Sequence, residues 1–235
     1  MKDEFDLRIE LLSDGTFGKG SGLPGRVDTE VQYDVKTGLP FVRGQVVKGL
    51  LVESCATVLQ SVRLHGQPGV LQRLREAAAW LFGRPGSRIA DEGKLDVGPG
   101  LLPAPLRKAV ASDVEAGRYS TEAAREALTA VRRQTAVDDV TGAPKEGSLR
   151  GRRVLLRQTT LTASLSISGT ASKDALSLLR TCARLVRRGG LRRSRGNAWL
   201  DTNLADARAA VGGEYADHFR ALVRGEDPAP HPSNA

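Results

Sequence analysis

Apolar and polar residues alternate with a period of two in several short stretches, which predicts strands. In residues 6–12, Leu7, Ile9 and Leu11 occupy one face of an extended chain, and the residues between them are charged. Residues 161–167 repeat the pattern, with Leu, Ala, Leu and Ile on one face and Thr and Ser on the other. This alternation is typical of strands that are buried on one side only. Extended chain is also expected at residues 27–33 and 154–156, and in a short strand after Trp199.

Five stretches are interpreted as helices, at residues 45–62, 70–82, 120–134, 173–188 and 204–223. In the first and fourth of them, the apolar residues fall on one helical face. Ser120 and Ser172 precede the third and fourth, where a serine side chain can accept a hydrogen bond from a free backbone N–H. Without the segments between them, the order of elements is strand, helix, strands, helix, strand. The sequence therefore predicts an α+β protein with a ferredoxin-like (RRM-like) βαββαβ core, in which helices back an antiparallel sheet.

The chain of 235 residues is expected to form one domain, residues 1–225, with two insertions. Residues 84–105 are rich in Gly and Pro, and the first insertion is expected at about 84–118. Residues 135–153 are polar and contain turn signals, which predicts a projecting hairpin or a mobile loop. The Pro-rich residues 226–235 are expected to be a disordered tail.

The charge balance favours a polyanionic partner. Lys and Arg number 35 against 27 Asp and Glu, a net charge of +8, which points to nucleic acid first and to an anionic membrane surface second. No apolar run approaches membrane-spanning length, and the first residues lack the pattern of a signal peptide. Cys55 and Cys182 fit no metal-binding spacing. We therefore expect a cytoplasmic protein with two buried thiols.

Two glycine-rich loops carry cations beside predicted strands. The first, residues 15–22, contains Lys19 and leads to Arg26, and the second places three arginines within four positions, 192–195. Arginines crowded together repel one another unless an anion neutralises them. A helix start near Gln45 adds free backbone donors between the two loops. Either loop alone is equally well explained as an ordinary turn, but together they predict phosphate binding. The glycines concerned are Gly18, Gly20, Gly44, Gly49, Gly189, Gly190 and Gly196.

Asp28 is the candidate catalytic carboxylate, because it lies in sequence between the first glycine loop and the helix start. Glu30 would share its face in an extended segment. Asp34 fits a turn, and Asp138 and Asp139 are interpreted as solvated charges of the projecting segment rather than as metal ligands.

Other kinds of site find no support in the sequence. His65, His218 and His231 are all distant in sequence from the glycine loops, and no Ser/His/Asp arrangement or Walker-type loop occurs. The aromatic residues that stack bases on an RRM sheet are also missing. Backbone-directed binding of RNA through loops and cations is therefore the better interpretation.

Five stretches of the sequence resemble motifs of the CRISPR-associated RAMP superfamily. Residues 27–51 resemble its N-terminal signature, in which an acidic strand leads through Thr-Gly-Leu-Pro into a Gly-Lys helix start. Residues 81–83 (Leu-Phe-Gly), 141–150 and 161–168 resemble its middle part, and residues 189–199 (GGLRRSRGNAW) its C-terminal glycine-rich loop. The motifs occur in the same order as in the superfamily and extend over nearly the whole chain. Within it, the chain is most similar to the repeated backbone subunit of type III effector complexes.

The resemblance implies a function and a set of partners. Such subunits resemble a right hand, in which a ferredoxin-like palm binds the backbone of the guide RNA and a thumb hairpin interrupts the guide–target duplex. The resemblance implies copies of the subunit in a filament, other effector-complex subunits as partners, and no membrane. In cleaving members an Asp cuts the target RNA with a divalent metal, usually Mg²⁺; here it corresponds to Asp28, and the thumb to residues 135–153. Guide contacts would come from Lys19, Arg26, Arg43, Lys48, Arg192, Arg193 and Arg195.

The chain departs from the family pattern at two places, and it leaves other functions open. Residues 43–49 (RGQVVKG) lack the usual serine pair, and Ala198 stands where the last glycine of the C-terminal loop is usual. A non-catalytic scaffold subunit is the alternative to the endoribonuclease. A guide-processing endoribonuclease is a weaker alternative, because its histidine would have to be His65. Glu30, Asp34 and Asp139 stay open as further ligands of the metal.

Overall fold

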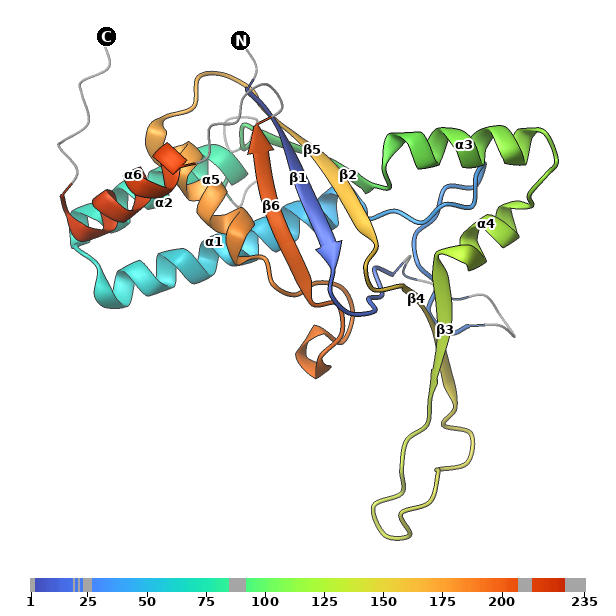
Figure 1. Ribbon diagram of the computed structural model, residues 1–235. Coiled ribbons are helices and arrows are strands. Elements are labelled where there is room, and N and C mark those ends of the chain that lie inside the picture. The colour runs from blue at the N-terminus through green and yellow to red at the C-terminus, as the bar shows by residue number, and fades with distance from the viewer. Residues whose placement is uncertain are drawn as a thin grey trace.

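A four-stranded antiparallel sheet forms the centre of the protein, whose computed structural model describes residues 3–18, 20, 22, 27–84, 92–206 and 213–226. Its strands are β1 (Asp3–Leu11), β2 (Leu95–Leu101), β5 (Thr160–Ile167) and β6 (Leu200–Asp206), in the order β2-β5-β1-β6 (Figure 1). The helical connection from β1 to β2 passes over β5, and the connection from β5 to β6 passes over β1. This is the split β-α-β arrangement, so the predicted ferredoxin-like core is confirmed.

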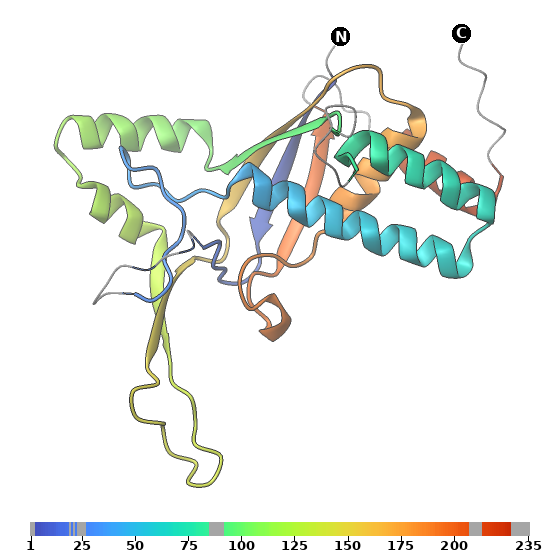
Figure 2. The same cartoon turned by 180° about the vertical axis from the view of Figure 1, so that it is seen from behind.

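Helices cover only one face of this sheet. The helices on that side are α1 (Gly44–His65), α2 (Pro68–Phe82), α5 (Lys173–Leu185) and α6 (Gly213–Arg224). Helices α1 and α5 contact the sheet, and α2 and α6 pack against α5 (Figure 2). Alternate residues of β1 (Phe5, Leu7, Ile9 and Leu11) are buried in the core between the sheet and these helices. Burial of this alternating face fixes the register of β1 against β5 and β6.

The opposite face of the sheet is open and polar. Glu4, Asp6 and Arg8 of β1 are exposed, as are Asp96 of β2 and Asp201 of β6. An antiparallel sheet tolerates such a half-solvated arrangement because only one face has to join the core. Most of the charged side chains on this face are acidic.

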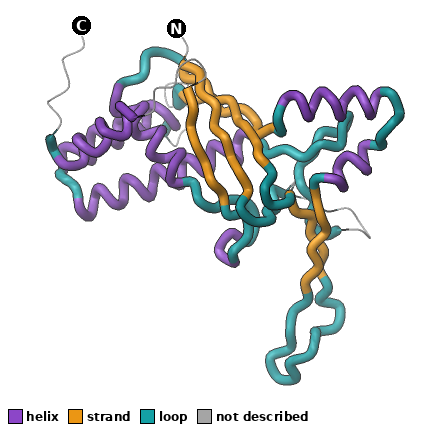
Figure 3. The backbone as a smooth tube through the Cα atoms, in the orientation of Figure 1, coloured by secondary structure: helices purple, strands orange, loops and turns teal. Residues whose placement is uncertain are grey.

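Two further parts of the chain extend away from the sheet (Figures 1 and 3). One contains α3 (Ala104–Glu115), which has no buried residue, and the short helix α4 (Thr121–Ala127). The other is a two-stranded hairpin of β3 (Thr129–Gln134) and β4 (Arg150–Leu155), closed by a long loop. The last of the elements before β6 is the 3₁₀ turn η2 (Arg193–Arg195).

The two serine caps are confirmed, but the helices they begin are shorter than expected, since α5 ends at Leu185 and α4 at Ala127. Ser120 Oγ accepts a hydrogen bond from the backbone N–H of Ala123 at 3.0 Å, and Ser172 Oγ accepts one from that of Ala175 at 3.1 Å. The prediction of a helix over 120–134 is wrong beyond Ala127, because the following residues pair with β4. Thr129 and Val131 are β-branched, and a partner strand far along the chain decides their conformation.

Four other predictions differ in their boundaries or lie outside the described part. The last helix begins at Gly213, because Leu204 still belongs to β6. Residues 95–101, expected in an insertion, form the edge strand β2. Residues 27–33 make isolated bridges instead of a continuous strand. The predicted tail beyond Glu226 lies outside the described residues.

Candidate nucleic-acid interface

Four segments from distant parts of the sequence meet at one end of the sheet. They are the N-terminal loop that follows β1 (described at residues 12–18, 20 and 22), the segment 27–33, the strand β4, and the loop of residues 189–198, which we call the C-terminal loop. Gly15 and Leu155 exchange backbone hydrogen bonds of 3.0 and 2.8 Å, which join the N-terminal loop to β4. Leu191 N donates to Thr16 O at 2.8 Å, which joins it to the C-terminal loop. The structure thus brings the two glycine-rich loops together, as the phosphate-binding hypothesis requires.

Asp28 is exposed and held in place by β4. Its backbone N–H donates to Gly151 O at 2.8 Å, and its Oδ2 accepts a hydrogen bond from Gly151 N at 2.6 Å. Arg153 N donates to Thr29 O at 2.9 Å, which continues the pairing of this segment with β4. Oδ1 accepts no hydrogen bond from the residues that the structure describes. The carboxylate is therefore oriented through one oxygen and free to act through the other.

A buried ion pair lies directly beneath this contact. Glu30 and Arg153 are separated by 3.0 Å, and their side chains are only 1% and 5% exposed. Val31 N also donates to Glu30 Oε1 at 3.0 Å, and Arg153 donates to Thr129 Oγ1 at 3.2 Å. A buried pair is costly to break because the remaining charge loses its compensation. Glu30 is thus committed to anchoring the hairpin to the Asp28 segment.

The C-terminal loop depends on close backbone contact with the N-terminal loop. Gly190 has φ +66°, and a Cβ there would lie 2.5 Å from Thr16 O, so only glycine fits. Ala198 also adopts a positive φ, 48°, and is fully buried. Its Cβ would be only 2.7 Å from a Cβ at Gly15. Because Gly15 has no side chain, the methyl group of Ala198 fits against it.

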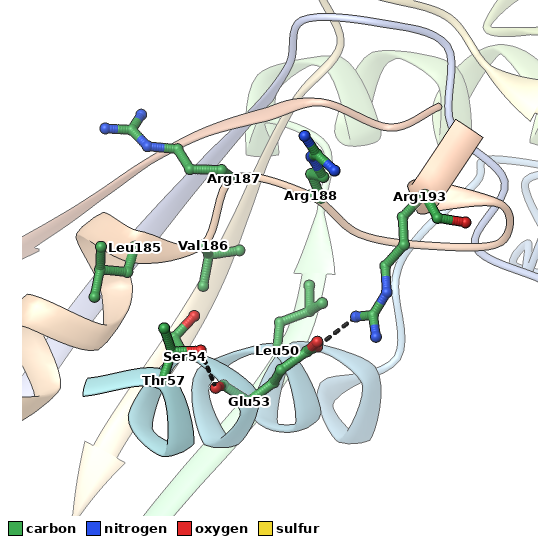
Figure 4. Close-up of a pocket in the computed structure, with 10 residues that line it drawn as sticks. Leu50, Glu53, Ser54, Thr57, Leu185, Val186, Arg187, Arg188 and Arg193 are labelled. Atoms are coloured by element: carbon green, nitrogen blue, oxygen red, sulfur yellow. Dashed lines mark hydrogen bonds and ion pairs between the residues drawn. The ribbon is translucent and has the colours of Figure 1, made fainter. Parts of the chain in front are cut away.

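The arginines of the C-terminal loop differ in their partners. Arg192 donates to Gln134 Oε1 on the hairpin, and Arg193 pairs with Glu53 on α1 (Figure 4). Arg195 is exposed, and its side chain makes no hydrogen bond or ion pair with the described residues; its backbone N–H donates to Arg192 O at 2.9 Å. Arg188, just before the loop, stacks on Trp199 with its guanidinium 4.1 Å from the ring centroid. Only part of this positive charge is neutralised within the protein.

The other predicted cations are less closely associated with the loops. Arg43 donates to Gln32 Oε1 at 3.0 and 2.6 Å. Lys48 donates to Leu95 O of β2 at 3.2 Å and does not face the loops. Gly49 has open space around its Cα, whereas a Cβ at Gly44 would lie 2.2 Å from Val97 O. Lys19 and Arg26 lie outside the described residues.

A hollow of about 520 Å³ lies between the loops and the start of α1. Asp28 and Thr29 line it on one side, Arg193 and Leu191 on another, and Gly18 and Gly20 belong to its lining as well. Next to it, the hollow of Figure 4 lies between α1 and the C-terminal loop and is lined by Arg187, Arg188 and Arg193. An extended polyanion that follows this edge would pass Asp28.

The acids do not form a ready-made metal cage. No group of three or more His, Cys, Asp or Glu that would hold a metal occurs in the described part of the chain. Asp34 accepts hydrogen bonds from the backbone N–H groups of residues 36 and 37 in a turn. Asp138 accepts from those of residues 140 and 141 at the hairpin tip, beside the exposed Asp139. Mg²⁺ is commonly bound by one or two carboxylates together with substrate phosphates and water. The free oxygen of Asp28 fits a site of this kind, which RNA phosphates would complete.

Sequence reasoning missed the contribution of the hairpin base. Arg152 donates to Asn197 Oδ1 at 3.0 Å, so β4 contacts the C-terminal loop directly. The Gly-Arg-Arg run at residues 151–153 was available as a signal. Its alternation of side chains places Arg153 in the core and Arg152 beside the loop.

The two histidines of the described part of the chain take no part in this interface, and His231 lies outside that part. His65 is the last residue of α1, at the opposite end from Gly44, and it is exposed. His218 lies 2.9 Å from Asp174 among α2, α5 and α6.

No helix in the described ranges is long and apolar enough to cross a bilayer.

Comparison with known proteins identifies the fold but no sequence family. No family model and no curated protein match the sequence. A chain in the cryo-EM structure of the type III-B Cmr-beta bound to cognate target RNA matches with a TM-score of 0.60 and 10% identity, over 86% of this chain and 96% of that chain. A chain of the type III-B Cmr-beta in the apo state matches with a TM-score of 0.62 and 11% identity, over 89% and 99%. Each match extends over most of both chains, so the similarity is not confined to a small part of the fold.

Proposed function

We propose that this protein is an RNA-binding backbone subunit of a type III CRISPR effector complex. The observation that carries the proposal is that both glycine-rich loops, the arginines of the C-terminal loop and Asp28 lie at one edge of a fold shared, over most of its length, with chains of a type III-B assembly. Its partners would be a guide RNA, a complementary target RNA, further copies of itself in a filament and other subunits. The complex would act in the cytoplasm.

The acidic open face of the sheet supports RNA binding at the loops instead of on the sheet. Asp6 and Asp96 would repel phosphates there, and no aromatic side chain of β1 lies on this face for base stacking. The loops, in contrast, offer arginines and close access to backbone N–H groups. Binding through the phosphate backbone carries no sequence information, which suits a subunit whose guide supplies the sequence.

We further propose that Asp28 cleaves the target RNA. With the RNA backbone distorted and held in line, the 2′-OH can attack the adjacent phosphorus. The attack forms a 2′,3′-cyclic phosphate as the P–O5′ bond breaks, and the 5′-oxygen leaves with a proton from water. A bound Mg²⁺ would neutralise charge on that phosphate. Oδ1 of Asp28 is available to hold the ion or to accept the proton of the 2′-OH, while Gly151 N–H holds Oδ2 in position.

The test compares wild type with Asp28→Asn and Asp28→Ala in the assembled complex, on end-labelled RNA complementary to the guide. Asp28→Asn retains an oxygen for Gly151 N–H, so loss of cleavage in this variant is not a loss of structure. We expect cleavage to fall by at least about 100-fold, the lower end for a general acid–base group, with RNA affinity unchanged. Asp6→Asn, which removes an equal charge from the open sheet face, should cleave normally. Regularly spaced fragments that persist in both Asp28 variants would exclude this role.

The alternative is a scaffold subunit that binds guide and target without cleaving them. It is favoured by the absence, among the described residues, of any group of three or more His, Cys, Asp or Glu that could hold a metal ion. In that case wild type and Asp28→Asn would bind RNA equally and neither would cut it. The guide-processing alternative loses support, because His65 lies at the far end of α1.

A further inference from the structure

Two arginines from different segments meet where the hairpin contacts the C-terminal loop. Arg152 of β4 donates from Nη2 to Asn197 Oδ1 at 3.0 Å, and Arg192 donates to Gln134 Oε1. Asn197 Nδ2 donates in turn to Arg192 O at 3.4 Å, which closes the junction. Each guanidinium therefore has only a neutral amide oxygen as its side-chain partner.

The acids near this junction are already engaged. Asp14 accepts from Arg132 at 2.9 and 2.6 Å and from Arg157 N at 3.0 Å. Glu53 is paired with Arg193, and Asp28 accepts from Gly151 N. No carboxylate of the described residues contacts Arg152 or Arg192. The positive charge at the junction is thus incompletely neutralised.

Arg152 also has hydrogen-bonding capacity that nothing fulfils. Its Nε and Nη1 are buried and have no hydrogen-bond partner in the part of the chain that the structure describes. Burial, and then the nearby charge of Arg192, lower the pKa of the Arg152 guanidinium, which means that the surroundings disfavour its charged form. A buried polar group without a partner is uncommon in folded proteins and suggests that a ligand is missing.

We propose that Arg152 and Arg192 form a binding site for a phosphate group, closed in the free protein by Asn197. A phosphate oxygen is a stronger acceptor for a guanidinium than an amide oxygen, because both partners are charged. A phosphate that displaces the Asn197 and Gln134 amides would satisfy Nε and Nη1 of Arg152 and separate the two like charges by an anion. Its identity as a phosphodiester of bound RNA rests on the proposed function; the site itself does not.

The first experiment uses inorganic phosphate and needs no RNA. Thermal unfolding of the full chain is measured in phosphate and in chloride at equal ionic strength, for wild type, Arg152→Gln and Arg63→Gln. Arg63 is exposed near the far end of α1, so its variant matches the change in net charge. We expect phosphate to raise the Tm of wild type and of Arg63→Gln but not of Arg152→Gln. In chloride, Arg152→Gln should have a higher Tm than wild type, because it removes a buried charge that lacks partners.

The second experiment measures RNA affinity as a function of salt, with single-stranded RNA and with an RNA duplex as separate ligands. Arg152→Gln should weaken binding of the ligand that occupies the site by about tenfold and reduce the salt slope by about 0.7, the contribution of one phosphate contact to a single strand. The ligand that is affected identifies the source of the phosphate.

The outcomes separate this inference from the proposed function. A lower Tm of Arg152→Gln in chloride, or a phosphate effect equal in all three proteins, would show that Arg152 is a structural residue and would overturn the site. Absence of RNA binding by wild type would refute the proposed function, while the phosphate measurement would still decide the site.

Discussion

At the scale of single residues, Ala198 shows how the protein accommodates a departure from a glycine-rich loop. Its φ of 48° belongs to the left-handed region, which costs a residue with a Cβ about 1 kcal/mol or more. The methyl group is fully buried against Gly15, so packing offsets part of this cost. Positions 15 and 198 are therefore coupled, because there is room for a Cβ at only one of them.

We expect Gly15→Ala to destabilise the protein by about 1–3 kcal/mol, the usual range for overpacking, because the new Cβ would lie 2.7 Å from that of Ala198. Ala198→Gly should be nearly neutral, since relief of the left-handed conformation balances the loss of about one buried methyl group, roughly 0.8 kcal/mol. The double variant should regain most of the loss. Urea unfolding of the four proteins measures the coupling, and strictly additive free energies would contradict it.

At the scale of elements, one carboxylate joins three helices. Asp174, in the first turn of α5, accepts hydrogen bonds from Arg73 of α2 at 2.9 and 3.0 Å and lies 2.9 Å from His218 of α6. Burial raises the pKa of Asp174, but the hydrogen bonds from Arg73 and His218 outweigh it and leave the pKa below its usual value. The ionised carboxylate thus holds α2 and α6 against α5.

Because the pKa of Asp174 is lower in the folded than in the unfolded protein, its stabilising effect is present above the unfolded pKa of about 3.9 and is lost as the pH falls through the folded value. Asp174→Asn should therefore reduce the free energy of unfolding at pH 7 by roughly 1–3 kcal/mol, and the difference from wild type should shrink below about pH 4. Urea unfolding at several pH values measures this. A difference that stays constant down to pH 3 would show that the charge of Asp174 is not responsible.

The sequence predicted those elements whose causes are local. The two serine caps and the alternating strands follow from neighbouring residues, and so does the order of elements that gives the ferredoxin-like core. The end of the helix at Ala127 does not, because β4, beginning at Arg150, is what makes the next residues a strand. For the same reason the sequence indicated Asp28 and the arginine loop as candidates, but not the support of Asp28 by Gly151 or the position of Arg152.

At the scale of the whole molecule, charge is divided between two surfaces. The open face of the sheet is mainly acidic, and the C-terminal loop together with β4 is cationic, within a chain whose net charge is +8. A polyanion is therefore repelled from one surface and attracted to the other. The net charge alone does not reveal this division.

We expect RNA affinity to decrease steeply with salt. With three phosphate contacts from the arginines of the C-terminal loop, the affinity for single-stranded RNA should fall roughly 20-fold between 50 and 200 mM salt. Arg195 is exposed, and its side chain has no hydrogen-bond or ion-pair partner among the described residues. Arg195→Gln should therefore make this salt dependence shallower at unchanged Tm. Filter binding at several salt concentrations tests it, and an affinity independent of salt would argue against backbone binding at this edge.

The contact between Asp28 and β4 also has a consequence for the order in which the protein is made. Asp28 and Gly151, like Glu30 and Arg153, are separated by 123 positions along the chain. Closing a loop of this length costs entropy before any contact compensates for it, and distant contacts of this kind form slowly. A chain that is still emerging from the ribosome and has fewer than 151 residues contains Asp28 but not Gly151, which orients it. The proposed cleavage centre therefore exists only after most of the protein has been synthesised, which keeps incomplete chains inactive towards RNA.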